Sequence, residues 1–369
     1  MTARVGIVGG GQLGRMLALA AAPLGVRCSV LDPAADACAA IAAEHIAAPF
    51  DDVAALRRLA AASDVVTFEF ENVPAAVLAA IGDDARLAPT AGALRASQDR
   101  LTEKRLFERV GIATAPYAAV ESLTDLRTAI ARIGTPAILK TRRLGYDGKG
   151  QVSLSSPGDA EQAWAAISRA PAILEGRVEF AREFSQIAVR STTAETAYYP
   201  LTENLHRDGI LRESRVPASA APDALAATAR DYAESLMNEL DYAGVLALEL
   251  FATGDGRLLA NEFAPRVHNS GHWTIDGAPA SQFENHIRAV LGLPLGAVAP
   301  AANCVMLNLI GEAPDSAAVL GVPGAHLHLY GKRPRPGRKI GHITLTEARP
   351  GSIEDGLARL RPLVDAAAA

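Results

Sequence analysis

The sequence has few cysteines, no excess of positive charge and no long apolar run. Three cysteines stand at Cys28, Cys38 and Cys304 without CxxC spacing, so neither a disulfide framework nor a structural zinc site is expected. The formal net charge of -5 offers no overall basic field to a nucleic-acid backbone. No segment approaches the roughly 20 uninterrupted apolar residues of a membrane span, and Arg15 ends the N-terminal apolar run before a signal-peptide core forms. We expect a cytoplasmic protein with reduced thiols and no nucleic-acid or membrane partner.

The order of expected elements indicates two kinds of fold. At 369 residues the chain has room for two or three domains. Strand and helix patterns alternate from residues 4–8 to 64–68, which predicts a parallel, doubly wound α/β sheet. The alanine run after Asp32 is expected to form one of its helices. From Pro136 onward short strands follow one another in hairpin-like succession, which is typical of an α+β region. Boundaries are expected near residues 98 and 294.

A glycine turn lies between the first strand and the first helix. Gly9–Gly14 matches GxGxxG, and Asp32 stands 18 residues beyond Gly14, near the position of a ribose-binding acid. Glycines let backbone N–H groups approach an anion at a helix N-terminus, so the turn predicts a phosphate contact. A dinucleotide-dependent oxidoreductase, with NAD or FAD, stays open as an alternative. A tight turn needed only for packing is another.

A second glycine-rich loop carries several cations. Arg142–Gln151 holds three glycines within six positions, which is typical of a mobile loop that covers phosphates. It lacks the GxxxxGK[ST] pattern of a Walker P-loop. The cations in and beside it are Lys140, Arg142, Arg143 and Lys149. We interpret the loop as a phosphate lid; a solvated hairpin is the alternative.

Two acids stand in apolar strands. Glu249 lies within the apolar run Val245–Phe251, where an ionised carboxylate is costly to bury without a partner or metal. Glu262 follows a second strand, and a hairpin through Gly254–Gly256 would bring the two carboxylates together. Magnesium commonly takes one or two carboxylates, with phosphates and water completing its shell. The pair therefore predicts a Mg-ATP site, with a buried arginine–glutamate pair as the alternative for either acid.

Two further glutamates flank apolar residues. Glu175 and Glu183 lie on either side of Val178 and Phe180. Carboxylates can accept from an adenine amino group and ribose hydroxyls while apolar side chains hold the base. Taken singly, each glutamate is more typical of a solvated surface charge.

A polar segment follows Glu262 directly. Arg266 is suited to stabilise charge on a transferring phosphoryl group, and His268 and Asn269 to hold a small oxyanion. His268 and His272 are four residues apart, but Pro265 and Gly271 argue against the helix that an HExxH-type zinc site needs. A zinc hydrolase is a distant third interpretation.

The chain resembles the ATP-grasp enzymes, and in particular the N5-carboxyaminoimidazole ribonucleotide synthetase family. The matching segments are spread over nearly the full length and occur in the family's order. They are GGGQLGRM at 9–16, TFEFENV at 67–73, GYDGKGQ at 145–151, ENLH at 203–206, NEFAPRVHNSGHW at 261–273 and YGKRPRPGRKIGH at 330–342.

The resemblance implies three domains and a nucleotide site. The domains are a Rossmann-like unit at 1–97, an ATP-grasp fold at 98–294 and a small β-rich unit at 295–369. The resemblance places Mg²⁺, with Mn²⁺ as an alternative, on Glu249 and Glu262. The residues implied to bind ATP are Arg100, Lys140, Gly145, Tyr146, Asp147, Gly148, Lys149, Gly150, Gln151, Glu175, Gly176, Arg177, Val178, Glu183, His206, Asn261 and Glu262.

The resemblance also implies the reaction. Bicarbonate attacks the γ-phosphate of ATP, and the carboxyphosphate formed carboxylates the exocyclic amine of 5-aminoimidazole ribonucleotide. The residues implied to act in this chemistry are Arg266, His268, Asn269, Tyr146 and Lys332. Those implied to bind the ribonucleotide are Gly11, Gln12, Leu13, Glu69, Glu71, Tyr146, Asp147, Lys149, Lys332 and Arg338. A homodimer is expected from the resemblance.

Other activities stay open at this point. Another ATP-grasp ligase, such as a formate-dependent glycinamide ribonucleotide transformylase or a biotin-carboxylase-like subunit, shares most of the nucleotide-site motifs. The segment at 330–342 favours the aminoimidazole enzyme over both. A non-enzymatic nucleotide sensor would bind ATP without turning it over.

Overall fold

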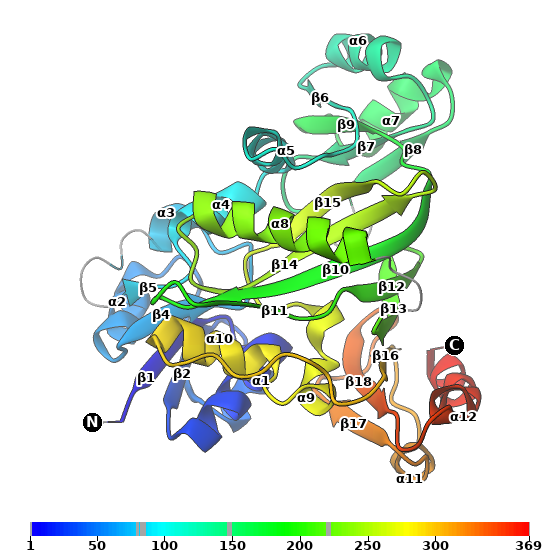
Figure 1. Cartoon of the computed structure of the whole chain (residues 1–369). Helices are drawn as coiled ribbons and strands as arrows, with labels where there is room; N and C mark the ends of the chain where they lie inside the picture. The colour runs from blue at the N-terminus through cyan, green and yellow to red at the C-terminus, as the bar shows by residue number, and fades with distance from the viewer. Residues whose placement is uncertain (1, 79–80, 82–85, 146–149, 219–222, 369) are drawn as a thin grey trace.

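The computed structural model of the chain describes residues 2–78, 81, 86–145, 150–218 and 223–368. Within these residues the strands form three sheets, of five, four and nine strands (Figure 1). The five-stranded sheet lies at the N-terminal end, the four-stranded sheet at the opposite end, and the nine-stranded sheet between them and toward the C-terminus.

The first sheet is the doubly wound unit that the sequence predicted. Its strands are all parallel, in the order β3-β2-β1-β4-β5. They are β1 (Arg4–Val8), β2 (Arg27–Asp32), β3 (Glu44–Ala47), β4 (Val65–Phe68) and β5 (Arg86–Leu87), with helices α1 (Gln12–Ala21), α2 (Val53–Ala61) and α3 (Ala75–Leu78). The prediction of a helix after Asp32 is wrong. That segment forms a single 3₁₀ turn at Cys38–Ile41 and then the edge strand β3.

The four-stranded sheet is antiparallel, in the order β6-β9-β7-β8. Two helices, α4 (Ala91–Ser97) and α5 (Arg100–Arg109), lead into it. It contains β6 (Tyr117–Val120), α6 (Leu123–Ile133), β7 (Ala137–Thr141), β8 (Gln151–Leu154), α7 (Ala160–Ala166) and β9 (Ala172–Gly176). Side chains of α6 and α7 pack against one face, so the other face is open to the rest of the molecule.

The nine-stranded sheet runs β15-β14-β10-β12-β13-β16-β18-β17, with β11 beside β10. Its first part contains β10 (Phe180–Arg190), β11 (Thr196–Tyr198), β12 (Thr202–Arg207), β13 (Ile210–Val216), α8 (Asp223–Glu239), β14 (Gly244–Thr253), β15 (Leu258–Ala264), α9 (Thr274–Gly277) and α10 (Gln282–Leu291). Its second part contains β16 (Cys304–Ile310), α11 (Ser316–Leu320), β17 (Ala325–Leu329), β18 (Lys339–Thr346) and α12 (Ser352–Ala368). Because β13 pairs with β16, the last 75 or so residues extend the sheet of the preceding region.

Helices cover both faces of β10 and β14. Side chains at alternate positions of a strand point to opposite faces. Val245 accordingly packs with Phe283 of α10, whereas Leu246 packs with Leu236 of α8. Figure 1 shows α8 and α10 on the two sides of these strands.

Close packing explains the last glycine of the turn between β1 and α1. A Cβ on Gly14 would lie 2.6 Å from the carbonyl oxygen of Gly9, so the backbone would have to move. We expect Gly14→Ala to destabilise the fold by about 1–3 kcal/mol, as overpacking does. The urea midpoint of unfolding measures this change.

Gly92 is the matched control for Gly14. It also lies in a helix, α4, but the nearest atom to its added Cβ is 3.5 Å away, which is an ordinary contact. Gly92→Ala should be neutral or stabilising by up to about 0.5–1 kcal/mol. Equal effects at the two positions would contradict the steric explanation.

Candidate active site

Two glutamates face each other on the hairpin of β14 and β15. Glu249 and Glu262 are direct cross-strand partners, and the strands join through the predicted turn at 254–256. Nε2 of His268 lies 3.0 Å from Oε1 of Glu249, and Nη1 of Arg100 donates to Oε2 of Glu262 at 2.8 Å. Desolvation raises the pKa of Glu249, but the His268 hydrogen bond and nearby positive charges outweigh it and lower the pKa to about 2. The hairpin thus presents two carboxylates side by side.

The same face continues into β10 and β12. Glu183 of β10 pairs across the sheet with Phe251, two residues along β14 from Glu249. Burial lowers the pKa of His206, but the hydrogen bond to Glu183 and the negative charge of that carboxylate together have the larger effect. The pKa of His206 is therefore raised overall. Phe251 stacks on Phe180, with ring centroids 4.6 Å apart. Apolar rings therefore lie on the same sheet as a hydrogen-bonded glutamate–histidine pair.

The opposite wall comes from the four-stranded sheet. Nζ of Lys140 on β7 donates to Oε2 of the buried Glu175 on β9 at 3.0 Å, and Nζ of Lys104 lies 3.6 Å from the same oxygen. Burial raises the pKa of Glu175, but the two lysines lower it to about 2. Its Oε1 has no hydrogen-bond partner within the described parts of the chain, so the wall holds a free acceptor. Gly176, Arg177 and Val178 follow Glu175 at the end of β9.

Asp99 anchors the glycine-rich loop. Its buried carboxylate caps α5 and accepts two bonds from Arg142, from Nε at 3.0 Å and Nη2 at 2.9 Å. Nε of Arg143 donates to it at 3.1 Å. Burial raises the pKa of Asp99, but these guanidinium groups hold it below its usual value. Arg142 and Arg143 are thus both paired with Asp99 at the root of the loop, and their contact with phosphates stays a prediction.

The tip of that loop was a central part of the sequence prediction. Tyr146, Asp147, Gly148 and Lys149 lie outside the described residues. The two ends of the loop are described: Gly145 and Gly150 lie close together, and Gln151 begins β8.

The segment after β15 crosses to the first sheet. Nη2 of Arg266 lies 3.0 Å from Oε1 of Glu71, which follows β4. The buried Gln282 of α10 holds the backbone of His268 from both sides: its Oε1 accepts from His268 N at 3.0 Å and its Nε2 donates to His268 O at 2.7 Å. Both polar side-chain atoms of Asn269 are buried with no hydrogen-bond partner in the described structure. Asn269 therefore has unused donor and acceptor capacity beside His268.

The glycine turn of the first sheet encloses a carboxylate. Oε1 of Glu69 accepts from Gly11 N at 2.7 Å, and its Oε2 accepts from Gly14 N at 3.0 Å. Burial raises the pKa of Glu69, while these N–H donors act in the opposite direction. Asp32 accepts from Gly10 N at 2.8 Å, so it is engaged inside the turn. This placement corrects the suggestion that Asp32 stands ready for a ribose.

The basic C-terminal loop reaches the same edge of the first sheet. Nζ of Lys332 contacts Oε1 of Gln12, and burial lowers the pKa of Lys332. Nη1 of Arg338 donates to Arg333 O at 3.2 Å. The side chain of Leu13 is buried in the core, so only its backbone is available to a ligand. Ligands of doubly wound sheets bind at the carboxyl ends of the strands, where these residues lie.

Three family models match successive parts of the chain. They are the ribonucleotide synthetase preATP-grasp domain at 1–98, the ATP-grasp domain at 105–283 and the phosphoribosylaminoimidazole carboxylase C-terminal domain at 304–355. The N5-carboxyaminoimidazole ribonucleotide synthase of Pseudomonas aeruginosa is 51% identical over 363 residues, which cover 98% of this chain and 100% of that protein. This chain belongs to the N5-carboxyaminoimidazole ribonucleotide synthase family.

Solved structures similar to this chain have the same fold. The N5-carboxyaminoimidazole ribonucleotide synthetase of Thermus thermophilus is 52% identical, with a TM-score of 0.94 over 98% of each chain. The N5-carboxyaminoimidazole synthase of Aspergillus clavatus in complex with ADP and 5-aminoimidazole ribonucleotide is 32% identical, with a TM-score of 0.91 over 99% of this chain and 98% of that one. The predicted ATP-grasp fold, with a Rossmann-like N-terminal unit and a C-terminal unit, is confirmed.

Several residues of this family member's site were not predicted from the sequence. Glu103 and Lys104 contact the backbone of β15, Asp99 anchors the loop, and Gln282 holds His268. Lys339 lies close enough to Glu249 and His206 to affect the pKa of both. For Lys339 a signal existed, because it stands within the basic segment at 330–342. The others resemble ordinary helix charges or amides.

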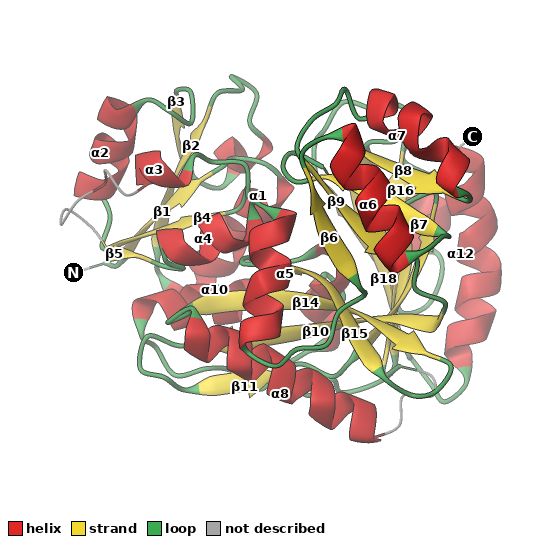
Figure 2. Cartoon of the chain, turned by 90° about the horizontal axis from the view of Figure 1, so that it is seen from above, coloured by secondary structure: helices red, strands yellow, loops and turns green. Residues whose placement is uncertain are grey.

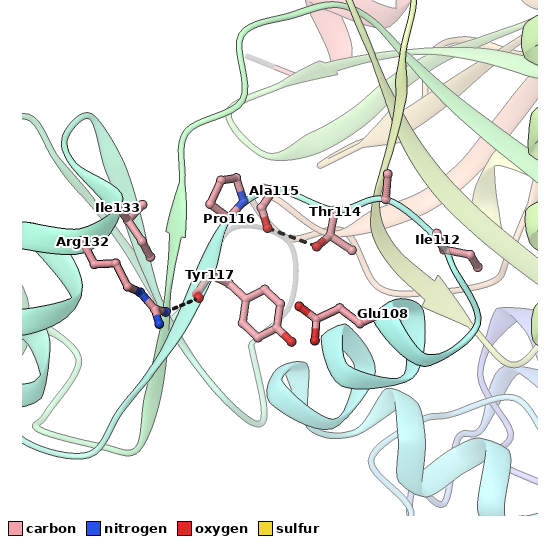
Figure 3. Close-up of a pocket in the computed structure, with 9 residues that line it drawn as sticks. Glu108, Ile112, Thr114, Ala115, Pro116, Tyr117, Arg132 and Ile133 are labelled. Carbon is pink, nitrogen blue, oxygen red and sulfur yellow. Dashed lines mark hydrogen bonds between the residues drawn. The ribbon is translucent and has the colours of Figure 1, made fainter.

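One cavity lies apart from these residues. It has a volume of about 610 Å³ and is bounded by the end of α5, the segment 112–116 and β6 (Figure 3). The phenol of Tyr117 points toward the carboxylate of Glu108, and Arg132 donates to Tyr117 O at 2.7 Å. None of the residues predicted to act on a ligand lines this cavity.

Proposed function

We propose that this chain is an ATP-dependent carbon–nitrogen ligase that carboxylates 5-aminoimidazole ribonucleotide with bicarbonate. The products are N5-carboxyaminoimidazole ribonucleotide, ADP and phosphate, in de novo purine synthesis. Membership of the family supports this, as do the ADP and ribonucleotide bound in the Aspergillus clavatus enzyme. The observation that carries the proposal is a set of polar contacts that extends from the β14–β15 hairpin to the edge of the first sheet. Arg100 pairs with Glu262, His268 with Glu249 and Arg266 with Glu71.

ATP is assigned to the space between the two walls. The free Oε1 of Glu175 can accept a hydrogen bond from the adenine amino group or from a ribose hydroxyl. Glu183 with His206 lies on the facing sheet. Lys140 and Arg100 bring positive charge to the phosphates. The remaining residues of this assignment are Gly145, Gly150, Gln151, Gly176, Arg177, Val178 and Asn261, together with the 146–149 tip.

Glu249 and Glu262 are assigned to magnesium, with manganese as a substitute. The donor set fits the ion, because hard cations prefer carboxylate oxygens and magnesium commonly takes only one or two from the protein. The cross-strand pairing supports the assignment, since both carboxylates leave the hairpin at the same point. When bound, the ion would neutralise phosphate charge. Arg100 contacts Glu262 and His268 contacts Glu249.

Bicarbonate is assigned to Arg266, His268 and Asn269. One of its oxygens attacks the γ-phosphorus, ADP leaves, and carboxyphosphate forms. The unused polar atoms of Asn269 and the guanidinium of Arg266 are suited to hold its negative charge. The ribonucleotide amine then takes the carboxyl group, releasing phosphate and a proton. Catalysis here rests on positioning and charge, and no covalent enzyme intermediate is required.

The ribonucleotide is assigned to the carboxyl edge of the first sheet. Lys332 and Arg338 supply positive charge for its phosphate, and Gly11, Gln12 and the Leu13 backbone lie beside them. Glu69 and Glu71 provide acceptors for the amine and ribose. Because Glu69 occupies the N–H groups of the glycine turn, the phosphate contacts are expected to come mainly from Lys332, Arg338 and Gln12. The 146–149 tip completes this assignment.

The remaining expectations belong to the same proposal. We divide the chain at 97/98 and 294/295, and we expect a homodimer in the cytoplasm, where the three unpaired thiols stay reduced. Within the described residues no helix has the length and apolar character needed to cross a bilayer.

A substrate-dependence assay tests the reaction. ADP release should require both bicarbonate and 5-aminoimidazole ribonucleotide for full rate. With ¹⁸O-labelled bicarbonate, one labelled oxygen should appear in the released phosphate, because the attacking oxygen stays on phosphorus when carboxyphosphate breaks down. Formate and glycinamide ribonucleotide serve as the control pair and should give no turnover above background. ATP turnover that ignores the ribonucleotide would defeat the assignment while leaving the fold in place.

A further inference from the structure

Strand β15 carries a β-bulge just before its glutamate. Glu249 pairs with Glu262, but the next residue of β14, Leu250, pairs with Ala260, so Asn261 is an extra residue. In a regular strand, neighbouring side chains point to opposite faces. Here Asn261 and Glu262 are both partly exposed, between buried residues on either side along the strand. The bulge therefore lets two consecutive side chains reach the candidate nucleotide site.

Helix α5 holds the outer edge of this bulge. β15 is the terminal strand of its sheet, so its outward backbone groups need other partners. Nζ of Lys104 donates to Asn261 O at 2.7 Å and to Ala260 O at 3.3 Å. Oε1 of Glu103 accepts from Phe263 N at 2.8 Å. Two neighbouring residues of α5 thus fix the backbone on both sides of Glu262. Figure 2 shows α5 lying over β14 and β15.

Both side chains are almost fully buried. Lys104 is 1% exposed and Glu103 is 2% exposed, and burying a charge is unfavourable unless it is paired and hydrogen-bonded. A buried ion pair is itself weak evidence for stability, since apolar residues of similar volume often serve as well. Helix packing alone therefore gives no reason for two ionisable side chains here. Their backbone contacts with β15 do.

Lys104 also connects the two walls of the site. Its Nζ lies 3.6 Å from Oε2 of Glu175, on the four-stranded sheet, while donating to Asn261 O on the nine-stranded sheet. Burial lowers the pKa of Lys104, and the charge of Glu175 opposes that shift. One ammonium group thus ties the adenine-side acceptor to the strand that carries the proposed metal ligand.

We propose that Glu103 and Lys104 form a brace that positions Asn261 and Glu262 for Mg-ATP by holding the β15 bulge. The brace residues touch neither nucleotide nor metal and act through the backbone of β15. This inference rests on the proposed role of Glu262 as a magnesium ligand. Outer residues that orient a metal ligand typically change metal affinity or activity about 10–100-fold when they are replaced.

Lys104→Met and Glu103→Leu test the brace in the full-length chain. Lys104→Met removes the contacts with Asn261 O and Ala260 O, and Glu103→Leu removes the contact with Phe263 N. Each introduces an apolar side chain of similar size, a change that buried sites often tolerate. We expect the Mg²⁺ concentration for half-maximal ADP release to rise about tenfold or more, with a smaller fall in kcat at saturating Mg²⁺ and ATP. The melting temperature gives a readout without turnover. ADP should raise it in every variant, and the further rise when Mg²⁺ is added with ADP should be smaller in the two brace variants than in the unaltered chain.

Two control variants separate the brace from general effects. Arg109→Met removes an exposed ion pair with Glu239 at the other end of α5 and should leave the Mg²⁺ requirement unchanged. Glu103→Gln keeps an oxygen acceptor for Phe263 N and should shift the requirement less than Glu103→Leu.

The outcomes are distinguishable. An unchanged Mg²⁺ requirement in folded Lys104→Met and Glu103→Leu overturns the brace. If one variant lacks a cooperative unfolding transition, the other decides; if both lack it, the pair belongs to the core alone and the proposal also fails. A Glu262→Gln variant with an unchanged Mg²⁺ requirement would instead overturn the proposed metal role, whatever the brace variants do.

Discussion

The Glu262→Gln variant is expected to release ADP about 10²–10³-fold more slowly than the unaltered chain, the loss that follows removal of one charged contact to the transition state. Glutamine keeps the size of the side chain but removes the charge that would bind magnesium. It also leaves the guanidinium of Arg100 without its carboxylate partner at 2.8 Å. The measurement is the steady-state rate at saturating ribonucleotide and bicarbonate, taken over a range of Mg²⁺ concentrations.

Asp255→Asn is the control for Glu262→Gln. Asp255 lies in the turn of the same hairpin, is exposed, and bonds locally to Thr253 and Arg257. Its substitution should change the rate by no more than about twofold, as surface changes usually do. A near-normal rate for Glu262→Gln, with the control equally unaffected, would remove Glu262 from the metal site.

Local patterns predicted the hairpin that carries the two glutamates. The strands at 244–253 and 258–264 are neighbours in sequence, and a short turn joins them, so their pairing follows from hairpin geometry. The glycine turn and the strand–helix alternation of the first sheet are equally local. By contrast, the alanines after Asp32 suit helix, turn or strand. The edge strand β3 formed there because β2 offered a free edge.

Long-range pairing was beyond the sequence. The C-terminal unit was expected as a small β-rich domain, and the pairing of β16 with β13 that joins its strands to the large sheet could not be foreseen. The apolar run Cys304–Ile310 does not indicate which strand it will pair with, because any exposed sheet edge can bond to the same backbone groups.

The supporting residues of the site were hidden for a related reason. Glu103 and Lys104 lie in a charged helix that resembles a solvated face, and Asp99 resembles a plain helix cap. Their partners lie about 40 to 160 residues away, as with Arg142 for Asp99 and Asn261 for Lys104. A single sequence contains the charges but not the contacts that bury them. The pairing of Arg142 and Arg143 with Asp99 could not be recognised from the sequence for the same reason.

Arg266→Met is the second change with a large expected effect. Arg266 joins the nucleotide side of the site to the first sheet through Glu71, at 3.0 Å, and also donates to Val267 O at 2.9 Å. If its guanidinium stabilises the negative charge on the phosphoryl group during transfer from ATP to bicarbonate, its loss should lower the rate of ribonucleotide carboxylation about 10²–10³-fold. Methionine preserves most of the apolar stem. Product formation and ADP release are measured together, and the ratio of product to ADP should fall if carboxyphosphate escapes to water.

Glu71→Gln separates two roles of Arg266, because it removes the partner and keeps the arginine. If Arg266 only ties the two domains together, Arg266→Met and Glu71→Gln should have similar effects, and the double variant should add little to either. If Arg266 stabilises the transferring phosphoryl group, Arg266→Met should lower the carboxylation rate about 10–100-fold more than Glu71→Gln does. Glu71→Gln should mainly raise KM for the ribonucleotide. The second pattern is expected. Either substitution breaks the Arg266–Glu71 contact, but only Arg266→Met removes the positive charge that acts on the substrate.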